Sequence, residues 1–336
     1  MLTRSLGTSG PRVSAIGLGC MGMSDLYGPA DENESVATIQ AALDAGVTLL
    51  DTGDYYGMGH NERLIREAIR GRRRDSAVIS VKFGALRDPS GAWLGVDARP
   101  AAVKNFISYT LRRLKTDYVD IYRPGRLDPT VPVEETVGAI AELIKAGHVR
   151  YVGLSEVGAD TIRRAHRTHP VTDLQIEYSL ISRSIERAIL PEVRSLGVGI
   201  TAYGVLSRGL LGGLWSKDRS PARGDLRSFL PRFTGDNLDH NLALVESLRR
   251  IANDKGATVA QIAIGWVLGR GDDIVPLVGA RRRDRLADAL GALDVQLNAD
   301  DLARIEEAVP PDAAAGTRYD ARQMEMLDSE RKDSER

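Results

Sequence analysis

The sequence predicts one domain of the α/β class, a single (β/α)8 TIM barrel with an N-terminal β-hairpin plug. Three observations lead to this fold class: eight short apolar runs, amphipathic stretches between them, and a length of 336 residues. Runs of Val, Ile and Leu bounded by Gly are typical of strands buried in a closed parallel sheet. Strands that alternate with helices favour a parallel sheet, and this length suits one α/β barrel.

The expected elements begin with the hairpin. Residues 3–14 contain a Ser-Gly-Pro turn and would close the floor of the barrel. The eight strands are then expected at Ala15–Gly19, Val47–Asp51, Ala77–Lys82, Tyr118–Tyr122, Val149–Leu154, Asp173–Tyr178, Val198–Tyr203 and Asp273–Val278.

Helices are expected between these strands. In residues 35–46, Val36, Ile39 and Leu43 recur at the helical period and Gly46 is a typical C-terminal cap. Residues 132–147 show the same apolar period. Each strand is therefore followed by a segment able to cover the outside of a barrel.

Two regions depart from this rhythm. The long loop Ser207–Asn241, between strands seven and eight, is rich in Gly, Pro and Arg, and loops of this length are either disordered or functional lids. The end of the chain, 317–336, is highly charged and is expected to form a mostly mobile tail. The barrel domain is accordingly expected to span residues 1–316.

Composition excludes several classes of function. The net charge of −1 gives no general attraction to nucleic acid or anionic membranes. The single cysteine, Cys20, permits no internal disulfide and suits a reducing compartment. The first residues lack the apolar segment of a signal peptide, and no apolar run approaches the roughly 18 residues of a membrane span. We therefore expect a cytoplasmic protein without a nucleic-acid or membrane partner.

Two short motifs suggest other chemistries but lack the required context. Residues 17–22 match GxGxxG, yet the segment that follows cannot begin the helix of a dinucleotide-binding βαβ unit. Residues 153–158 resemble a nucleophile elbow, but Val157 stands where GxSxG requires glycine. The sequence also contains no CxxC or HExxH spacing, so no metal site is expected.

Three polar residues are expected to meet at one rim of the barrel. Asp51 ends the second strand, Tyr56 follows in the next loop, and Lys82 ends the third strand. Carboxyl ends of barrel strands form the active-site mouth. A phenol can donate a proton, and a nearby ammonium group would lower its pKa from about 10. Taken singly, each residue also has an ordinary reading as a loop cap, lid packing or a solvated lysine.

The sequence here resembles the aldo-keto reductase superfamily. DTGDYYGMGHNE is similar to its DTAxxYG-type signature, and VISVKFG to the strand that carries its catalytic lysine. GLSE, LQIEYSL, ITAYGVLSRGLLGG and IVPLVGARRRDRLADAL match later family segments in order and spacing. The resemblance implies a catalytic tetrad, of which Asp51, Tyr56 and Lys82 are three members.

The fourth member of that tetrad, a histidine, is absent. The run YVDIYRPGRLDP places Gly125 at its position, so the chain resembles a member without this histidine, similar to pyridoxal-reductase-like and other bacterial-type aldo/keto reductases. Loss of the side chain is expected to leave open space for a bulky substrate over Gly125. His60 is a candidate substitute donor in the substrate pocket, with a surface-loop role as the alternative.

The resemblance also implies an NADPH/NADP+ site. Ser155 and Gln175 would bind the nicotinamide carboxamide, and Tyr203 would stack on the ring. Arg281 and Arg285, at the start of a helix, suit a 2′-phosphate and favour NADP(H) over NAD(H). The remaining cofactor contacts implied are Cys20, Met21, Asp51, Gly204, Val205, Leu206, Ser207, Gly209, Gly279 and Asp288.

The function implied is an NADP-dependent aldo/keto reductase, an oxidoreductase acting on CH–OH donors. It would reduce the aldehyde or ketone group of a small-molecule carbonyl substrate by hydride transfer, with Tyr56 as general acid activated by Lys82 and Asp51. The alternative is a non-enzymatic NADP(H)-sensing or regulatory partner subunit, which the missing histidine makes conceivable.

Overall fold

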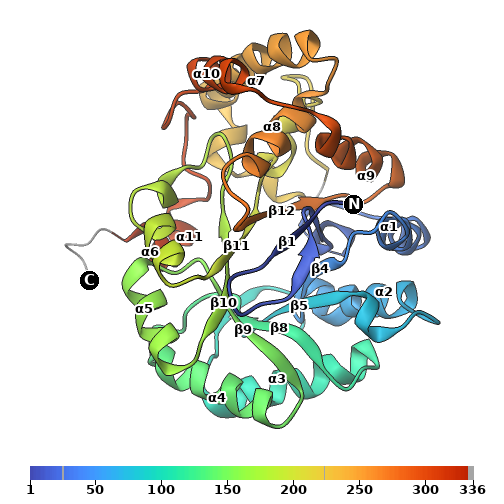
Figure 1. Ribbon diagram of the computed structural model, residues 1–336, viewed down its shortest axis with the longest axis vertical. Coiled ribbons are helices and arrows are strands. Elements are labelled where there is room, and N and C mark those ends of the chain that lie inside the picture. Colours follow the sequence, from blue (N-terminus) through green and yellow to red (C-terminus); the bar gives the residue numbers. More distant parts are fainter. Residues whose placement is uncertain (25, 223, 332–336) are drawn as a thin grey trace.

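Eight parallel strands close into a barrel in the computed structural model, which describes residues 1–24, 26–222 and 224–331 (Figure 1). In chain order the strands are β3 (Gly17–Gly19), β4 (Leu49–Gly53), β5 (Val78–Phe83), β8 (Val119–Pro124), β9 (Val149–Ser155), β10 (Val171–Glu177), β11 (Gly199–Tyr203) and β12 (Ile274–Gly279). Pairing of β12 with β3 closes the sheet. Each strand overlaps a run expected from the sequence, so the (β/α)8 fold class is confirmed.

Helices surround the barrel on all sides (Figure 1). The surrounding helices are α1 (Glu32–Asp44), α2 (His60–Ala68), α3 (Pro100–Leu114), α4 (Val133–Lys145), α5 (Ala159–Thr168), α6 (Ile189–Ser195), α8 (Val259–Leu268) and α9 (Arg283–Leu290). Local sequence sets their starts: Asp31 accepts a hydrogen bond from the Glu34 N–H at 2.7 Å, and Thr258 and Gln261 form a capping box before α8. Outside this ring, α7 (Gly235–Asp254) packs against α10 (Ala299–Ala308).

The N-terminal hairpin lies across the floor of the barrel, as expected. It consists of β1 (Thr3–Ser5) and β2 (Arg12–Ser14), which pair in antiparallel fashion. Leu6 and Val13 are buried against the strand residues Leu49, Ile121 and Val275. The hairpin therefore excludes water from the end of the barrel opposite the carboxyl ends of the strands.

Charged residues replace part of the apolar filling inside the barrel. The guanidinium of Arg123 on β8 lies 2.7 Å from a carboxylate oxygen of Asp173 on β10, and both side chains are fully buried. Thr201 on β11 also donates to Asp173. A buried pair of this kind needs its partners, because a single charge left in the interior would be costly.

Irregular segments cover the rim at the carboxyl ends of the strands. A hairpin that the sequence did not predict, β6 (Ala85–Arg87) and β7 (Trp93–Val96), follows β5 and exposes Trp93 and Leu94. Short 3-10 helices fill other loops: η1 (Met21–Met23), η2 (Tyr56–Gly59), η3 (Arg74–Ser76), η4 (Ser184–Glu186), η5 (Ser207–Gly212), η6 (Leu226–Ser228), η7 (Pro231–Phe233), η8 (Gly291–Asp294) and η9 (Asp328–Glu330).

The long loop between β11 and β12 reaches the loop that follows β3. The Leu226 N–H donates to the carbonyl of Leu26 at 2.9 Å, and Tyr27 forms an isolated bridge with Asp225. Arg223 of this loop lies outside the described residues. Two segments distant in sequence thus meet over one side of the barrel mouth.

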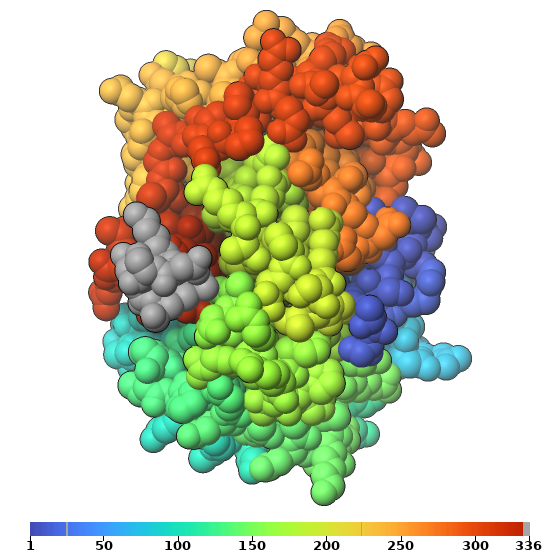
Figure 2. Space-filling view, turned by 60° about the vertical axis from the view of Figure 1, so that its left-hand side comes forward, coloured from blue at the N-terminus to red at the C-terminus, as the bar shows by residue number. Residues whose placement is uncertain are grey.

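The described part of the C-terminal segment, 317–331, packs against the barrel and includes the short helix α11 (Ala321–Glu325). The red band in Figure 2 follows the end of the chain across the molecule. Arg318 is buried and bonds both carboxylate oxygens of Glu156, at 2.9 and 2.5 Å. The mobility expected of the tail stays a prediction, but its charge serves here to form buried ion pairs. Residues 332–336 lie outside the described residues.

Replacing Arg318 with methionine should destabilise the fold by about 3–5 kcal/mol, because the change leaves a buried carboxylate without its cation. Burial acts to raise the pKa of Glu156, but the Arg318 guanidinium outweighs it and lowers that pKa below its usual range. The stabilisation by the pair is therefore present above the ordinary glutamate pKa of about 4.3 and is lost as pH falls through the lowered value. Urea unfolding at neutral pH measures the effect.

Arg322→Met on α11 is the matched control, since Arg322 is exposed and should cost little. If Arg318→Met and Arg322→Met unfold at the same urea concentration, the docking of this segment does not depend on the ion pair.

Candidate active site

Asp51 and Lys82 form a buried ion pair at the carboxyl ends of β4 and β5. The two strands pair in parallel with Gly53 opposite Lys82, so the neighbouring strand ends bring these side chains together. The Lys82 ammonium donates to one carboxylate oxygen of Asp51. The other oxygen accepts from Ser80 at 2.9 Å and from Gln175 at 2.7 Å. The predicted convergence of Asp51 and Lys82 is therefore present.

Tyr56 lies next to this pair, in the turn that follows β4. Gly57 and Gly59 have positive φ angles of 54° and 91°, which give the chain the tight turn that directs Tyr56 back over the barrel. The phenol ring is 5% exposed, and its centre lies 5.5 Å from the Lys82 ammonium. All three residues expected to converge at the mouth thus do so.

The electrostatics of Tyr56 differ from the expectation. Burial raises the pKa of Tyr56 well above its usual value, and Tyr55 and Asp51 raise it further, whereas Arg126 acts to lower it. Lys82 was expected to depress this pKa, but its charge is offset by the Asp51 carboxylate in contact with it. Tyr56 is consequently a protonated phenol at neutral pH.

The space above Gly125 is occupied, so the expectation of an open pocket there is wrong. A Cβ atom at Gly125 would lie 2.9 Å from the Tyr55 hydroxyl and 3.3 Å from Cε1 of the same ring. Gly125 also has no positive φ angle, so its backbone does not itself require glycine. Tyr55 takes the volume into which a histidine at this position would project.

His60 points away from the substitute role considered for it. Its Nδ1 lies 2.9 Å from Ser24 Oγ, and its Nε2 lies 2.8 Å from a carboxylate oxygen of Glu32. Both ring nitrogens are therefore engaged by the loop before α1. The structure favours the alternative, a structural role in this loop, over the substrate pocket.

The predicted nicotinamide residues surround the same mouth. Ser155 ends β9 and is 1% exposed, and its buried hydroxyl has no hydrogen-bond partner among the described residues. Gln175 on β10 donates to Asp51, which links this group directly to the ion pair. Tyr203 ends β11, where its hydroxyl lies 3.0 Å from that of Tyr319.

Sequence reasoning missed a buried ion network beside this group. Glu156 and Glu177 are 1% and 2% exposed, and both face Arg318 of the C-terminal segment. Glu177 also bonds Arg208 at 2.9 Å, with Arg232 at 3.6 Å. The signal available in the sequence was the pair of acidic residues at strand ends, for which no partner could be assigned.

The turn after β11 has an unusual backbone conformation. Gly204, Ser207, Arg208 and Gly209 have positive φ angles of 67°, 44°, 56° and 96°. The N–H groups of Ser207 and Gly209 donate to the carbonyls of Gly204 and Leu206 at 2.6 and 2.8 Å, and these bonds hold the turn closed. The Ser207 hydroxyl is buried and, within the described part of the chain, has no hydrogen-bond partner. Val205 and Leu206 belong to this turn.

Cys20 and Met21 follow β3 on the adjoining side of the mouth. Cys20 is fully buried, and its N–H donates to the carbonyl of Asp51 at 3.0 Å. Met21 begins η1 and is half-buried. These positions agree with the neighbourhood expected for them.

The two arginines expected at the 2′-phosphate differ in their surroundings. Arg281 is half-buried and donates to the carbonyls of Tyr27, Gly28 and Pro29 at 3.0, 3.4 and 3.2 Å. Arg285 is exposed and lines a hollow of about 260 Å³ between the turn after β11 and the ends of α7 and α8.

The other predicted contacts lie on either side of α9. Gly279 ends β12, ahead of the two arginines. Asp288 accepts a hydrogen bond from Thr258 at 2.9 Å. Within the described residues Arg285 donates to no backbone carbonyl, and its Nε lies 3.7 Å from a carboxylate oxygen of Asp284.

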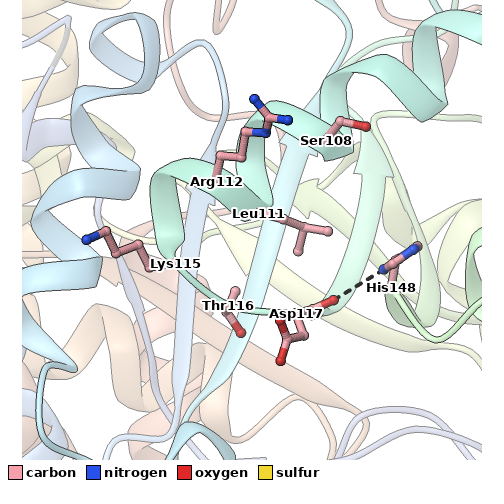
Figure 3. Close-up of a pocket in the computed structure, with 7 residues that line it drawn as sticks. All are labelled: Ser108, Leu111, Arg112, Lys115, Thr116, Asp117 and His148. Atoms are coloured by element: carbon pink, nitrogen blue, oxygen red, sulfur yellow. Dashed lines mark hydrogen bonds between the residues drawn. The ribbon is translucent and has the colours of Figure 1, made fainter.

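A larger hollow, of about 470 Å³, lies at the other end of the barrel (Figure 3). Its lining comes from the end of α3 and from the loops that precede β8 and β9, with His148 Nδ1 3.3 Å from the Asp117 carbonyl oxygen. The amino-terminal ends of these strands carry none of the candidate site residues described in the preceding paragraphs. In a barrel of this kind that end serves stability rather than chemistry.

Two further classes of site are absent from the described residues. They contain no group of three or more His, Cys, Asp or Glu side chains placed to hold a metal ion. None of their helices is both long enough and apolar enough to cross a membrane.

The fold and the rim together define an α/β-barrel protein with an acid–base group at the carboxyl ends of its strands. Residues 15–310 match the aldo/keto reductase family. A soybean (Glycine max) protein named probable aldo-keto reductase 1 is 41% identical over 315 residues, which cover 94% of this chain and 90% of that protein. The chain therefore belongs to the aldo/keto reductase family, a family of oxidoreductases that act on carbonyl compounds.

Solved structures of the family are similar to this one. The glycerol dehydrogenase from Gluconobacter oxydans has a TM-score of 0.83 at 26% identity, over 91% of this chain and 94% of that one. An aldo-keto reductase from Bacillus halodurans in its holo form has a TM-score of 0.76 at 27% identity, over 96% and 99%. A thermostable aldo-keto reductase in complex with the inhibitor epalrestat has a TM-score of 0.74 at 29% identity, over 92% of this chain and 100% of that one.

Proposed function

We propose that this protein is an NADPH-dependent reductase that converts an aldehyde or ketone to an alcohol. The observation that carries the proposal is the buried Asp51–Lys82 pair beside Tyr56 at the mouth of the barrel. The family defines the general oxidoreductase class. The roles of individual residues, the cofactor and the direction of the reaction are part of the proposal.

NADPH, when bound, would supply the hydride that reduces the carbonyl carbon. The carbonyl oxygen then gains negative charge and needs a proton, which Tyr56 would donate. Its raised pKa keeps Tyr56 protonated until such an oxygen approaches. Lys82, held by Asp51, would stabilise the phenolate that remains, and burial of both strengthens this electrostatic effect.

The described residues fit a nicotinamide cofactor. The unpartnered hydroxyl of Ser155 offers a hydrogen bond to a carboxamide, and Tyr203 presents a ring at the end of β11. In the turn Gly204–Gly209, the Ser207 hydroxyl, which has no partner among the described residues, offers a hydrogen bond to a pyrophosphate oxygen. Arg285 is exposed at the end of this path, 3.7 Å from a carboxylate oxygen of Asp284, and would hold the 2′-phosphate, whereas Arg281 fixes the loop that contains Tyr27.

A non-enzymatic, cofactor-sensing subunit remains the second candidate function. It would use the same cofactor residues without turnover. The position of Tyr55 weakens the reason for considering it, because the volume of the absent histidine holds another polar group. Measured turnover with any carbonyl compound decides between the two functions.

Tyr56→Phe should abolish carbonyl reduction while NADPH still binds, because the change removes the proton donor and keeps the ring. General acid catalysis contributes roughly 10²–10⁴-fold. NADPH oxidation against a panel of aldehydes and ketones, including pyridoxal and bulky aromatic and sugar carbonyls, gives the rate. Fluorescence titration gives the dissociation constant.

Tyr109→Phe, at an exposed position on α3, is the control for the loss of a phenol hydroxyl. Full activity of Tyr56→Phe on its best substrate would show that Tyr56 is not the acid.

Arg285→Ala should weaken NADPH binding and leave NADH binding nearly unchanged, because only NADPH carries the 2′-phosphate. A charge-assisted hydrogen bond is worth roughly 1.5–3 kcal/mol. Arg281→Ala should weaken both cofactors, since Arg281 secures a loop rather than a phosphate. Isothermal titration with each cofactor measures these differences.

Arg283→Ala on the same helix is the control, because Arg283 pairs with Glu34 at 2.9 Å. Equal losses for NADPH and NADH in Arg285→Ala would contradict the assignment of the 2′-phosphate.

A further inference from the structure

Tyr55 presents its hydroxyl group at the place of the missing histidine. The hydroxyl would lie 2.9 Å from a Cβ atom at Gly125, so any larger side chain there would have to displace it. The Gly125 N–H donates to the carbonyl of Phe83 on β5 at 2.8 Å, and this bond fixes the backbone of Gly125. Tyr55 can thus occupy this space only because residue 125 is a glycine.

The same hydroxyl is paired with that of the proposed acid. The rings of Tyr55 and Tyr56 meet edge to face, with centres 4.9 Å apart and planes at 79°. Their hydroxyls interact, and this interaction raises the pKa of Tyr56 and acts to lower that of Tyr55. Tyr56 is thus the donor in this pair, which leaves the proton of Tyr55 available to an oxygen atom placed beside both phenols.

We propose that Tyr55 is a second catalytic residue, which donates a hydrogen bond to the substrate carbonyl oxygen while Tyr56 transfers the proton. The proposal rests on the proposed reductase function. Tyr55 keeps its own proton throughout, so the proton balance of the reaction is unchanged. A fixed donor aimed at the oxygen on which charge develops stabilises the transition state more than the bound substrate.

Tyr55→Phe tests this role because the ring and its contact with Gly125 remain. We expect kcat to fall about 10²-fold, with the NADPH dissociation constant and the melting temperature unchanged. Tyr109→Phe again serves as the control and should keep wild-type kcat. Steady-state kinetics on the best aldehyde of the panel, fluorescence titration and a thermal melt provide the three readouts.

The outcomes distinguish failure of the Tyr55 proposal from failure of the proposed reductase function. If Tyr56→Phe is inactive and Tyr55→Phe stays within twofold of wild type, Tyr55 is not a donor and the reductase function stands. If Tyr56→Phe is fully active, the proposed acid is wrong and the failure lies in the proposed function. A fall in kcat for Tyr55→Phe with unchanged cofactor affinity supports the second donor.

Arg126 supports an independent inference about the substrate. It follows Gly125 at the mouth and is half-buried, and among the described residues no carboxylate lies within ion-pair distance of it. Its guanidinium donates to the carbonyl of Gly125 at 2.7 Å, and the Tyr319 ring centre lies 6.0 Å away.

Four other arginines inside the barrel or beside the ion network have carboxylate partners. Arg123 pairs with Asp173, Arg318 with Glu156, and both Arg208 and Arg232 with Glu177. Arg126 differs from them because it has no carboxylate within ion-pair distance among the described residues, and Glu156 acts on it only from farther away. A half-buried cation of this kind favours an anion, since guanidinium groups bind carboxylate and phosphate in a planar, bidentate manner.

We propose that Arg126 selects a carbonyl substrate that carries an anionic group, carboxylate or phosphate, beside the reacting carbonyl. This proposal also rests on the reductase function and is independent of Tyr55. It is tested with matched substrates: butanal against succinic semialdehyde for carboxylate, and pyridoxal against pyridoxal 5′-phosphate for phosphate.

The wild-type enzyme should prefer one anionic substrate over its neutral partner in kcat/KM, and Arg126→Met should reduce that ratio at least tenfold. The pair that shows the change identifies the anion. Arg322→Met, at an exposed position, is the control and should keep the wild-type ratio. A wild-type preference for both neutral partners, or an unchanged ratio in Arg126→Met, would overturn the proposal, whereas lack of turnover on every carbonyl would instead count against the reductase function.

Discussion

The ion pair between Asp51 and Lys82 is the contact on which the arrangement of the mouth depends. A carboxylate and an ammonium group are both removed from water, so each requires the other and the remaining lone pairs require donors. Ser80, on the same strand as Lys82, and Gln175, on a third strand, provide those donors. One carboxylate thereby ties β4, β5 and β10 together and fixes the cation beside Tyr56.

Burial also explains the acid–base properties of the proposed site. Lys82 lies next to Tyr56, yet the pKa of the phenol is raised because the phenolate would have to form in a dry pocket beside Asp51. The Tyr56 phenol therefore keeps its proton until a substrate oxygen that develops negative charge lies next to it. Its acidity then depends on the substrate and the cofactor as much as on the protein.

A second set of buried charges connects the barrel to the end of the chain. Glu156 and Glu177, which end neighbouring strands, bind arginines from the long loop and from the C-terminal segment. Both carboxylates lie beside Tyr203 and Ser155, the residues that we propose to contact nicotinamide. The C-terminal segment therefore shares a wall with the proposed site, through charges that in sequence alone resembled a solvated tail.

The sequence by itself determined the barrel, its eight strands, the N-terminal hairpin and the convergence of Asp51, Tyr56 and Lys82. These follow from local pattern: buried strands have a characteristic composition, and every parallel strand delivers its carboxyl end to the same rim. Only the tertiary structure decided that Tyr55 fills the space above Gly125, that His60 turns toward Glu32, and that Arg318 reaches Glu156. Each of these contacts joins residues that are distant in the sequence. No local period or spacing predicts which side chain will occupy a space between two such segments. The sequence identified Gly125 as a departure from the family's histidine. What occupies the space at Gly125 is decided by the ring of Tyr55, which the fold brings from the end of another strand.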